Sequence, residues 1–285
     1  MAQIIDGKQV STVLKEDIKN RVCDFIGEFG YAPGLAVIIV GNDPASKVYV
    51  RNKHRACELV GIRSIQIEYP SDTTEDEVIQ KIYELNNDSS IHGILVQLPL
   101  PPHIKEERVI NAIVKEKDVD AFNPYNVGRI LTGDYTFLPC TPAGVMSLLD
   151  YYNVEISGKN CVVVGRSNIV GKPMALLLLE RNGTVTVCHS KTQNLTSFTK
   201  EADILVVAVG RAGFITPDMI KEGAVVVDVG INRLENGTLV GDVDFEGAKE
   251  VASLITPVPG GVGPMTITTL LENTLRSAIE SEKRA

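Results

Sequence analysis

The chain has 285 residues, of which 44% are hydrophobic, and carries a net charge of −8. Its length exceeds the usual single-domain size of about 100–200 residues, so we expect two domains or one large one. The acidic balance argues against a nucleic-acid partner, because phosphate binding requires a basic face. The first residues show no basic segment followed by an apolar run, and all apolar runs are far shorter than the roughly 20 residues of a membrane helix. We therefore expect neither secretion nor a membrane partner.

The cysteines favour reduced thiols in a cytoplasmic protein. They are odd in number, scattered and never spaced as CxxC, and the histidines show no ligand spacing either. No metal site is expected. The cysteines are Cys23, Cys57, Cys140, Cys161 and Cys188.

In the first half of the chain, strand-like apolar runs alternate with helical patterns. Continuous hydrophobic strands joined by helices indicate a parallel sheet covered on both faces. A polar segment with proline and glycine, residues 122–142, then interrupts the pattern, and we place a domain boundary near 138–141. The expected strands cover 34–41, 64–70 and 91–101, and the expected helices cover 46–61, 73–88 and 106–114.

The second half begins a new α/β pattern. Its order of strands and helices is the βαβαβ order of a dinucleotide-binding sheet. We therefore expect an α/β protein of two three-layer α/β/α domains, the second a Rossmann-like NAD(P)-binding domain. A last helix at 266–284 is expected to return to the first domain. The strands of the second half are expected at 160–165, 184–190, 203–210 and 224–230, with helices at 143–152 and 166–181.

Lys53 falls on the apolar side of its predicted helix. At about 100° per residue, Tyr49, Lys53, Ala56, Cys57 and Val60 share one arc. The charged or polar residues Arg51, His54, Arg55 and Glu58 fall on the opposite, water-facing side. Burying an unpaired ammonium is costly and generally lowers its pKa, which makes lysine a usable proton acceptor near neutral pH. The alternative is a lysine whose stem follows the apolar face and whose amine reaches solvent.

Three other polar features of the first domain and the late loop stand out. Gln97 is a lone amide in an apolar strand, so it needs a partner, either the Lys53 amine or other core groups. Asp118 and Asp120 fall in a loop, where aspartates are more often caps. The segment 257–264, PVPGGVGP, suits close backbone approach to a flat ligand, or is only a linker.

A glycine-bearing turn, residues 165–173, lies between the first strand and the first helix of the second half. This is the setting that a pyrophosphate requires, because free N–H groups at a helix start face the anion. The spacing is not GxGxxG, and Gly165 and Gly171 could also be ordinary turn glycines. We favour a nucleotide site.

The end of the next strand indicates which dinucleotide binds. NAD enzymes usually place a carboxylate there for the ribose 2′-hydroxyl, whereas this chain reads Cys188-His189-Ser190-Lys191. Ser190, with Arg166 across the turn, could bind a 2′-phosphate, so we expect NADP. Lys191 is either a further phosphate ligand or, more simply, a solvated loop cation.

Six ordered motifs over nearly the whole chain resemble one known family, the bifunctional methylenetetrahydrofolate dehydrogenase/methenyltetrahydrofolate cyclohydrolases. The resemblance implies an NADP-dependent enzyme that oxidises 5,10-methylenetetrahydrofolate and hydrolyses the methenyl product to 10-formyltetrahydrofolate. It also implies a homodimer with a cleft between a folate-binding catalytic domain (1–139 with 265–285) and a Rossmann-like NADP-binding domain (140–264). The motifs are YVRNK, VQLPLP, KDVDAFNP, PCTPAGV, GRSNIVGKP and TPVPGGVGPMT.

The resemblance also implies roles for individual residues. Lys53 would be the general acid/base, Tyr49 would orient the folate, Gln97 would hydrogen-bond Lys53, and Asp120 would hold the edge of the pterin-type ring. One departure is Ala121, where the family typically has glycine, so a methyl group could narrow the ring pocket. The implied substrate residues are Tyr49, Val50, Arg51, Asn52, Lys53, Val96, Gln97, Leu98, Asp120, Pro259, Gly260, Gly261, Val262 and Gly263. The implied cofactor residues are Gly165, Arg166, Ser167, Ser190 and Ile231.

Three alternative functions differ in what they explain. A short-chain dehydrogenase also uses Tyr-x-x-x-Lys, but there the pair follows the nucleotide glycines, whereas here it precedes them by more than a hundred residues. A non-catalytic dinucleotide sensor would explain the second half but not a lysine on an apolar face. A monofunctional dehydrogenase or cyclohydrolase is poorly separated from the bifunctional enzyme by sequence.

Overall fold

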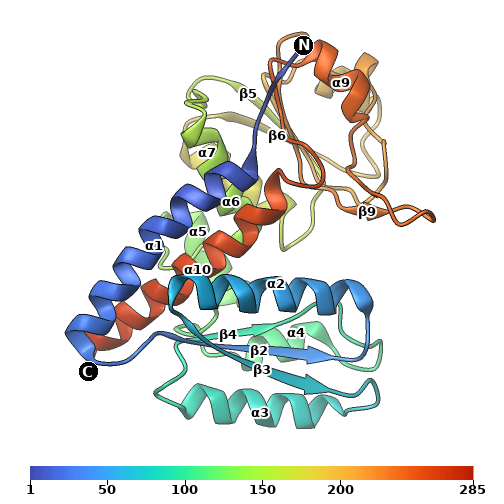
Figure 1. Ribbon diagram of the computed structural model, residues 1–285. Coiled ribbons are helices and arrows are strands. Elements are labelled where there is room, and N and C mark those ends of the chain that lie inside the picture. Colours follow the sequence, from blue (N-terminus) through green and yellow to red (C-terminus); the bar gives the residue numbers. More distant parts are fainter. Residues whose placement is uncertain (285) are drawn as a thin grey trace. The chain divides into compact units, whose positions relative to one another are not determined.

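The computed structural model describes residues 1–284, the side chain of Ala45 excepted, and divides into two compact units (Figure 1). The three-stranded unit comprises Val13–Leu138 with Ile267–Ala285, and the six-stranded unit comprises Met1–Thr12 with Pro139–Thr266. Among the described residues, no helix combines the length and apolar character needed to cross a bilayer.

The three-stranded unit is built on a parallel sheet in the order β3-β2-β4. The central strand β2 (Gly34–Val40) is buried along its whole length, and β4 (Gly93–Val96) is buried as well. The edge strand β3 (Arg63–Tyr69) contains only exposed and half-buried residues. Figure 1 shows α2 on one side of this sheet and α3 on the other, as expected for continuous apolar strands covered on both faces.

Local sequence signals define the two helices that cover this sheet. α2 (Pro44–Val60) begins after Asp43, whose carboxylate accepts the N–H of Ser46 at 2.7 Å, and ends at Gly61 with a left-handed φ of 84°. α3 (Glu75–Asn87) begins with a capping box between Thr74 and Glu77. The sheet and both helices were predicted, with ends displaced by a few residues.

Among the described residues, four α-helices fall where no helix was predicted, two of them the short α8 (Leu195–Thr199) and α9 (Phe245–Val251) of the six-stranded unit. α1 (Gly7–Phe29) carries a buried stripe that includes Val10, Ile18 and Val22, which is a helical spacing. α5 (Pro124–Thr132) lies in the segment that we expected to be irregular, capped by Asn123. The remaining helices that enter this unit are α4 (Glu106–Ala112) and α10 (Val262–Glu282), and the unit boundaries fall inside both α1 and α10.

The six-stranded unit contains, among the described residues, a parallel sheet in the order β1-β11-β8-β7-β5-β6. Val164 is paired with both Cys188 and Val207, and Val207 is paired with Asp228. The carboxyl ends of four strands are therefore level, and the residues that follow them share one edge. The strands are β1 (Gln3–Ile4), β5 (Asn160–Val164), β6 (Thr184–Cys188), β7 (Ile204–Val207), β8 (Val225–Asp228) and β11 (Leu254–Ile255).

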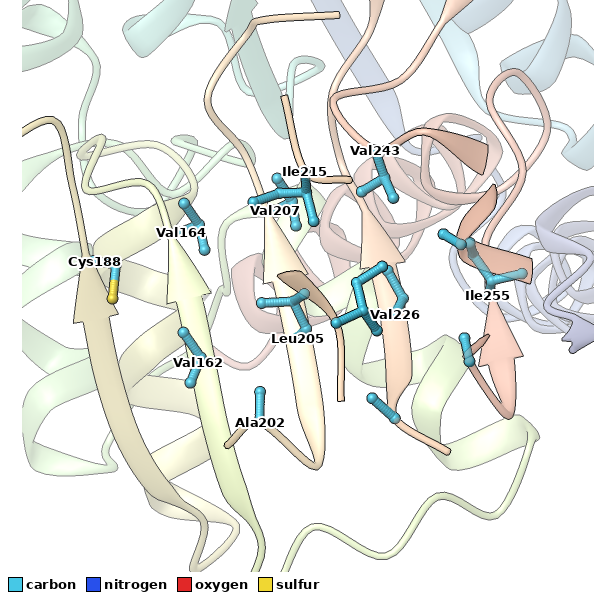
Figure 2. Packing of buried hydrophobic residues seen from close by; sticks show 14 residues of the cluster. Val162, Val164, Cys188, Ala202, Leu205, Val207, Ile215, Val226, Val243 and Ile255 are labelled. Atoms are coloured by element: carbon cyan, nitrogen blue, oxygen red, sulfur yellow. The ribbon is translucent and has the colours of Figure 1, made fainter. Parts of the chain in front are cut away.

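The core of this unit follows from the two-residue period of its strands. Val162 with Val164, and Leu205 with Val207, alternate along their strands and pack in one cluster with Val226 (Figure 2). Residues 1–12 belong to this unit because β1 pairs with β11. Its other elements are α6 (Cys140–Tyr151), α7 (Gly171–Glu180), α8 (Leu195–Thr199), the 3₁₀ turn η1 (Pro217–Met219), the β9 (Asn232–Arg233) and β10 (Leu239–Val240) hairpin, and α9 (Phe245–Val251).

Candidate functional site

The amine of Lys53 is buried and paired with an amide. Lys53 is 7% exposed, and its Nζ donates a hydrogen bond to Oε1 of Gln97 at 3.0 Å. The inward orientation predicted from the helix pattern is confirmed, and the amine does not reach into bulk solvent. An amide oxygen is a neutral acceptor, so the pair differs from the ion pair in which a buried lysine is usually held.

The position of Gln97 at the end of β4 orients its amide. Its backbone N–H donates to the carbonyl of Ile38 at 2.8 Å and so extends the sheet by one residue. Its Nε2 donates to the carbonyl of Leu98 at 2.7 Å. Because one end of the amide is occupied in this way, the other end, Oε1, is directed at Lys53.

Two neutral groups flank Lys53 on α2. Tyr49, one turn earlier, is half-buried, and burial raises the pKa of its phenol. Cys57, one turn later, is buried, and this burial raises the pKa of its thiol to about 12, with the hydrogen bond to Ser64 and the charge of Lys53 acting in the opposite direction. Both groups keep their protons at neutral pH, so neither competes with Lys53 as a base.

The other face of α2 is largely open to water. Arg51, Arg55 and Glu58 are exposed, as predicted, whereas His54 is half-buried. Among the predicted substrate residues near Lys53, Asn52 and Arg51 are exposed, Leu98 is half-buried, and Val50 and Val96 belong to the core.

Asp118 is buried and hydrogen-bonded to the turn before α5. It is 1% exposed and accepts the N–H of Asn123 and the Nδ2 of Asn126, each at 2.8 Å. Burial raises the pKa of its carboxyl to about 6, although these hydrogen bonds favour the charged form. The cap of α5 is Asn123, so Asp118 does not cap a helix but holds the turn that leads into it.

Asp120 lies in the turn that follows and is half-buried, between two residues whose backbone groups are hydrogen-bonded. Asn273 of α10 donates to the carbonyl of Val119 at 2.8 Å, and Ala121 donates to the carbonyl of Asp118 at 3.0 Å. Ala121 is fully buried with a φ of 57°, in the left-handed region that disfavours side chains with a Cβ. A glycine at this position would avoid this backbone strain, because it has no Cβ.

The loop Pro259–Gly263 belongs to the six-stranded unit. Pro259 is exposed and Gly263 is half-buried, whereas Gly260, Gly261 and Val262 are buried. A Cβ built on Gly263 would lie 3.9 Å from Cδ1 of Ile231. The structure thus brings this predicted substrate loop to a predicted cofactor residue.

The glycine turn after β5 is tightly closed. A Cβ on Gly165, whose φ is 135°, would lie 2.3 Å from the carbonyl oxygen of Ala208, and a Cβ on Gly171 would lie 2.2 Å from that of Gly165. The hydroxyl of Ser167 accepts the N–H groups of Val170 at 3.1 Å and of Gly171 at 3.3 Å. Two N–H groups at the start of α7 are therefore satisfied within the turn, a feature that the sequence did not predict.

The predicted cofactor residues follow strands that end level. Gly165 follows β5, Ser190 comes two residues after β6, and Ile231 comes three residues after β8. Arg166, Ser167, Ser190 and Ile231 are all exposed. The structure therefore places these residues along one edge of the six-stranded sheet, where open α/β sheets bind ligands.

Two buried aspartates of this edge were missed by the sequence analysis. Asp228 ends β8 and Asp242 follows β10; they are 3% and 0% exposed. Asp228 is a lone acidic residue in an apolar strand, the same signal that identified Gln97, so it could have been singled out. Asp242 carries no comparable signal. Across residues 1–284, no group of His, Cys, Asp and Glu side chains is arranged to hold a metal ion.

Two family models match this chain. The catalytic domain of tetrahydrofolate dehydrogenase/cyclohydrolase matches residues 5–120, and the NAD(P)-binding domain of the same family matches residues 139–282. Both matches together cover nearly all of the two units.

Named relatives and solved structures agree with these models. The protein called Bifunctional protein FolD in Acetivibrio thermocellus is 60% identical over 277 residues, which is 97% of this chain and 97% of its own length. The crystal structure of the bifunctional methylenetetrahydrofolate dehydrogenase/cyclohydrolase from Campylobacter jejuni is 50% identical, with a TM-score of 0.96 over 99% of this chain and 100% of that one. The Trypanosoma brucei structure, complexed with NADP cofactor and an inhibitor, is 39% identical, with a TM-score of 0.96 over 99% of both chains.

Proposed function

Because the chain belongs to the tetrahydrofolate dehydrogenase/cyclohydrolase family, we propose that Lys53 is the group that moves protons in its active site. The protein is a bifunctional enzyme: it oxidises 5,10-methylenetetrahydrofolate to 5,10-methenyltetrahydrofolate with NADP and hydrolyses the methenyl form to 10-formyltetrahydrofolate. The observation that carries the proposal is the 3.0 Å hydrogen bond between the buried amine and Gln97. A sensor without catalysis would not require this pair.

The oxidation step requires positioning but no base. A hydride leaves the methylene carbon of the folate, and the nitrogen lone pair completes the cationic methenyl product. NADP, when bound, supplies the hydride acceptor. No proton leaves the substrate in this step, so the chain contributes mainly orientation of the reactants.

The hydrolysis step requires a proton to be removed and returned. Water adds to the methenyl carbon and one of its protons is removed, and the carbon–nitrogen bond then breaks as that nitrogen takes up a proton. The remaining hydroxyl proton is released to solvent as the hydroxyl oxygen becomes the formyl oxygen. We assign both transfers to the amine of Lys53, which Gln97 holds without neutralising its charge. By the same proposal Tyr49 orients the folate and Asp120 holds the edge of its ring. We keep as proposed substrate residues the others that the resemblance implies, namely Val50, Arg51, Asn52, Val96, Leu98, Pro259, Gly260, Gly261, Val262 and Gly263.

The edge of the six-stranded sheet fits an extended dinucleotide. In strand order, Ser190 follows β6, the Gly165 turn follows the adjacent β5, and Ile231 follows β8 beyond β7. We assign the 2′-phosphate of NADP to Ser190 with Arg166, and the pyrophosphate to the turn with Ser167. Ile231 is assigned to the nicotinamide end. The absence of a carboxylate at residues 188–191 supports NADP over NAD.

Further assignments rest on the same family membership. We propose that the three-stranded unit is the folate-binding catalytic domain and the six-stranded unit the NADP-binding domain. The bounds expected from the sequence, 1–139 plus 265–285 and 140–264, differ from these units mainly at residues 1–12, which belong to the six-stranded unit because β1 pairs with β11. We also propose a homodimer that works in the cytoplasm. The burial of four cysteine thiols supports a reducing compartment.

The decisive experiment replaces the amine. Lys53→Met is expected to abolish hydrolysis of 5,10-methenyltetrahydrofolate while the protein unfolds at the temperature of the parent. Lys47→Met is the matched control, because Lys47 is an exposed lysine of the same helix, paired with Asn42. Hydrolysis at the parental rate in Lys53→Met would refute the proposal.

A further inference from the structure

Two buried carboxylates organise the carboxyl edge of the six-stranded sheet. Asp228 and Asp242, the acidic pair, lie among apolar residues and are 3% and 0% exposed. Burying two like charges near each other opposes folding, and their repulsion is one of the causes that raise the pKa of Asp228 to about 6, after burial itself. Such a costly arrangement in a sheet that is otherwise apolar calls for a purpose beyond filling the core.

Asp228 fixes the backbone on both sides of the β9–β10 hairpin. Its Oδ1 accepts the N–H groups of Gly230 at 2.9 Å and of Asp242 at 3.0 Å, and its Oδ2 accepts the N–H of Val243 at 2.9 Å. The start and the end of the hairpin are thus held on one carboxylate.

Asp242 fixes two loops at once. Its oxygens accept three consecutive N–H groups from the loop after β7, those of Val209, Gly210 and Arg211, at 2.6, 2.9 and 2.8 Å. Its Oδ1 also accepts Nδ2 of Asn232 at 2.8 Å. The loop after β7 and the loop after β8 are therefore tied to the same side chain.

The acidic pair holds the residues on both sides of Ile231 in the chain. The residue before it, Gly230, is bound to Asp228, and the residue after it, Asn232, is bound to Asp242. A Cβ on Gly230 would lie 2.2 Å from Cγ of Asp242, so the backbone approaches the second carboxylate closely as well. The exposed Ile231 side chain is consequently presented from a backbone with little freedom to move.

We propose that the acidic pair is a positioning device for the nicotinamide end of the bound dinucleotide, holding Ile231 and the loop 209–211 in the geometry that hydride transfer requires. This inference rests on the proposed function, which assigns Ile231 to the cofactor. The 2′-phosphate end at Ser190 lies three strands away, about 14 Å along the edge. The acidic pair therefore acts on the reacting end of the cofactor and not on the choice between NADP and NAD.

The test replaces each carboxylate by an amide. In Asp228→Asn and Asp242→Asn, an NH₂ group faces backbone N–H groups, so the loops lose acceptors without losing volume. We expect kcat of the NADP-dependent oxidation to fall by about tenfold or more, because misplacement by about 1 Å can cost about a hundredfold in rate. Hydrolysis of methenyltetrahydrofolate by the same preparation is expected to change far less. The ratio of activities with NADP and NAD is expected to stay the same.

Asp203→Asn is the matched control. Asp203 precedes β7 at the opposite edge of the same sheet, where it accepts the N–H of Asn160 at 2.8 Å and the Nζ of Lys221 at 2.6 Å. This variant perturbs two hydrogen bonds of a carboxylate in the same unit. Its melting temperature should fall while its oxidation and hydrolysis rates remain those of the parent.

A milder variant covers the case in which the amide variants do not fold. Asn232→Ala removes one donor to Asp242 and should lower kcat of the oxidation a few-fold, again with hydrolysis retained. Equal losses of oxidation and hydrolysis, or unchanged oxidation, in the folded variants would overturn the inference. A parent enzyme that fails to reduce NADP with methylenetetrahydrofolate would instead refute the proposed function itself.

Discussion

The two units both place a polar side chain at the carboxyl end of a buried parallel strand, but they partner it differently. At the end of β4, Gln97 contacts a single side-chain amine, that of Lys53. At the end of β8, Asp228 receives backbone N–H groups on both oxygens. A side-chain amine can exchange a proton, whereas a backbone amide cannot do so usefully at neutral pH. The first arrangement therefore suits chemistry, and the second suits the positioning of loops.

The strongest challenge to this comparison is removal of the amide at position 97. Gln97→Leu leaves the Lys53 ammonium buried without its acceptor, so we expect methenyltetrahydrofolate hydrolysis to fall by about 10²–10⁴-fold, the range typical of lost acid–base catalysis. Gln66→Leu, at an exposed position of β3, serves as the control and should leave the rate unchanged. Parental hydrolysis in Gln97→Leu would show that the amide is only a core group.

The next largest effect concerns acid stability of the three-stranded unit. His92 is 3% exposed, and burial lowers its pKa to about 4. Its Nδ1 accepts the N–H of Gly34 at 2.9 Å. Since the unfolded chain binds the proton near pH 6.5 and the folded chain only near pH 4, stability is lost as the pH falls through this window. Between pH 7 and pH 5 the loss should be about 2 kcal/mol.

His92→Asn tests this pH dependence, because its Oδ1 can accept the same N–H without titrating. Urea unfolding at pH 7 and pH 5 should show a smaller acid loss in the variant than in the parent. Asp118 and Asp228, whose raised pKa values act in the opposite sense, are present in both proteins and cancel in the comparison. An identical acid loss in variant and parent would contradict the assignment to His92.

A smaller effect is expected at the far end of the cofactor edge. Ser190→Ala removes a hydroxyl from the proposed 2′-phosphate site, so the ratio of kcat/KM for NADP to that for NAD should fall by about tenfold, as for the loss of a hydrogen bond to a charged group. Thr192→Ala, two residues later, is a useful comparison, because its hydroxyl accepts the N–H of His189 and belongs to the loop. A ratio lowered equally in both variants would indicate a general loosening of the loop.

The smallest expected effect is a gain in stability. Ala121→Gly relieves a left-handed residue with a φ of 57° and should raise the free energy of unfolding by about 1 kcal/mol or less, because the more flexible unfolded chain offsets part of the gain. Chemical denaturation of both proteins measures the difference. Ala56→Gly, in the interior of α2, should change stability in the opposite direction by a similar amount. A lower stability of Ala121→Gly would show that the packing of the Ala121 methyl group stabilises the fold by more than the backbone strain destabilises it.

Much of the fold could be predicted because its signals are local. The buried strands β2 and β4 are continuous apolar runs, β8 is apolar up to its last residue, Asp228, and α3 begins with a capping box. By contrast, β1 has two residues and exists only through pairing with β11, in which Gln3 is paired with Leu254. α1 was missed although its buried residues follow a helical spacing, so that omission reflects an unread pattern and not a missing signal.

The residues of the candidate site also differ in whether local sequence signals could predict their contacts. The inward direction of Lys53 follows from helix periodicity, and the need of Gln97 for a partner follows from its apolar strand. The hydrogen-bond set of Asp242 could not be predicted, because its donors come from residues 209–211 and Asn232 and are assembled only by the sheet. Similarly, nothing local indicates that Ser167 closes its own turn.

Because the amide of Gln97 is neutral, few other side chains could replace it beside Lys53. A glutamate of the same length would form an ion pair with Lys53 and keep the proton on its Nζ. A leucine would leave the buried ammonium without a hydrogen-bond acceptor. Glutamine has a suitable length and can hydrogen-bond the amine in either protonation state. Its amide oxygen accepts a hydrogen bond from the ammonium and equally from the neutral amine. Substitutions at this position should therefore be tolerated only where the hydrolytic half of the enzyme has been abandoned.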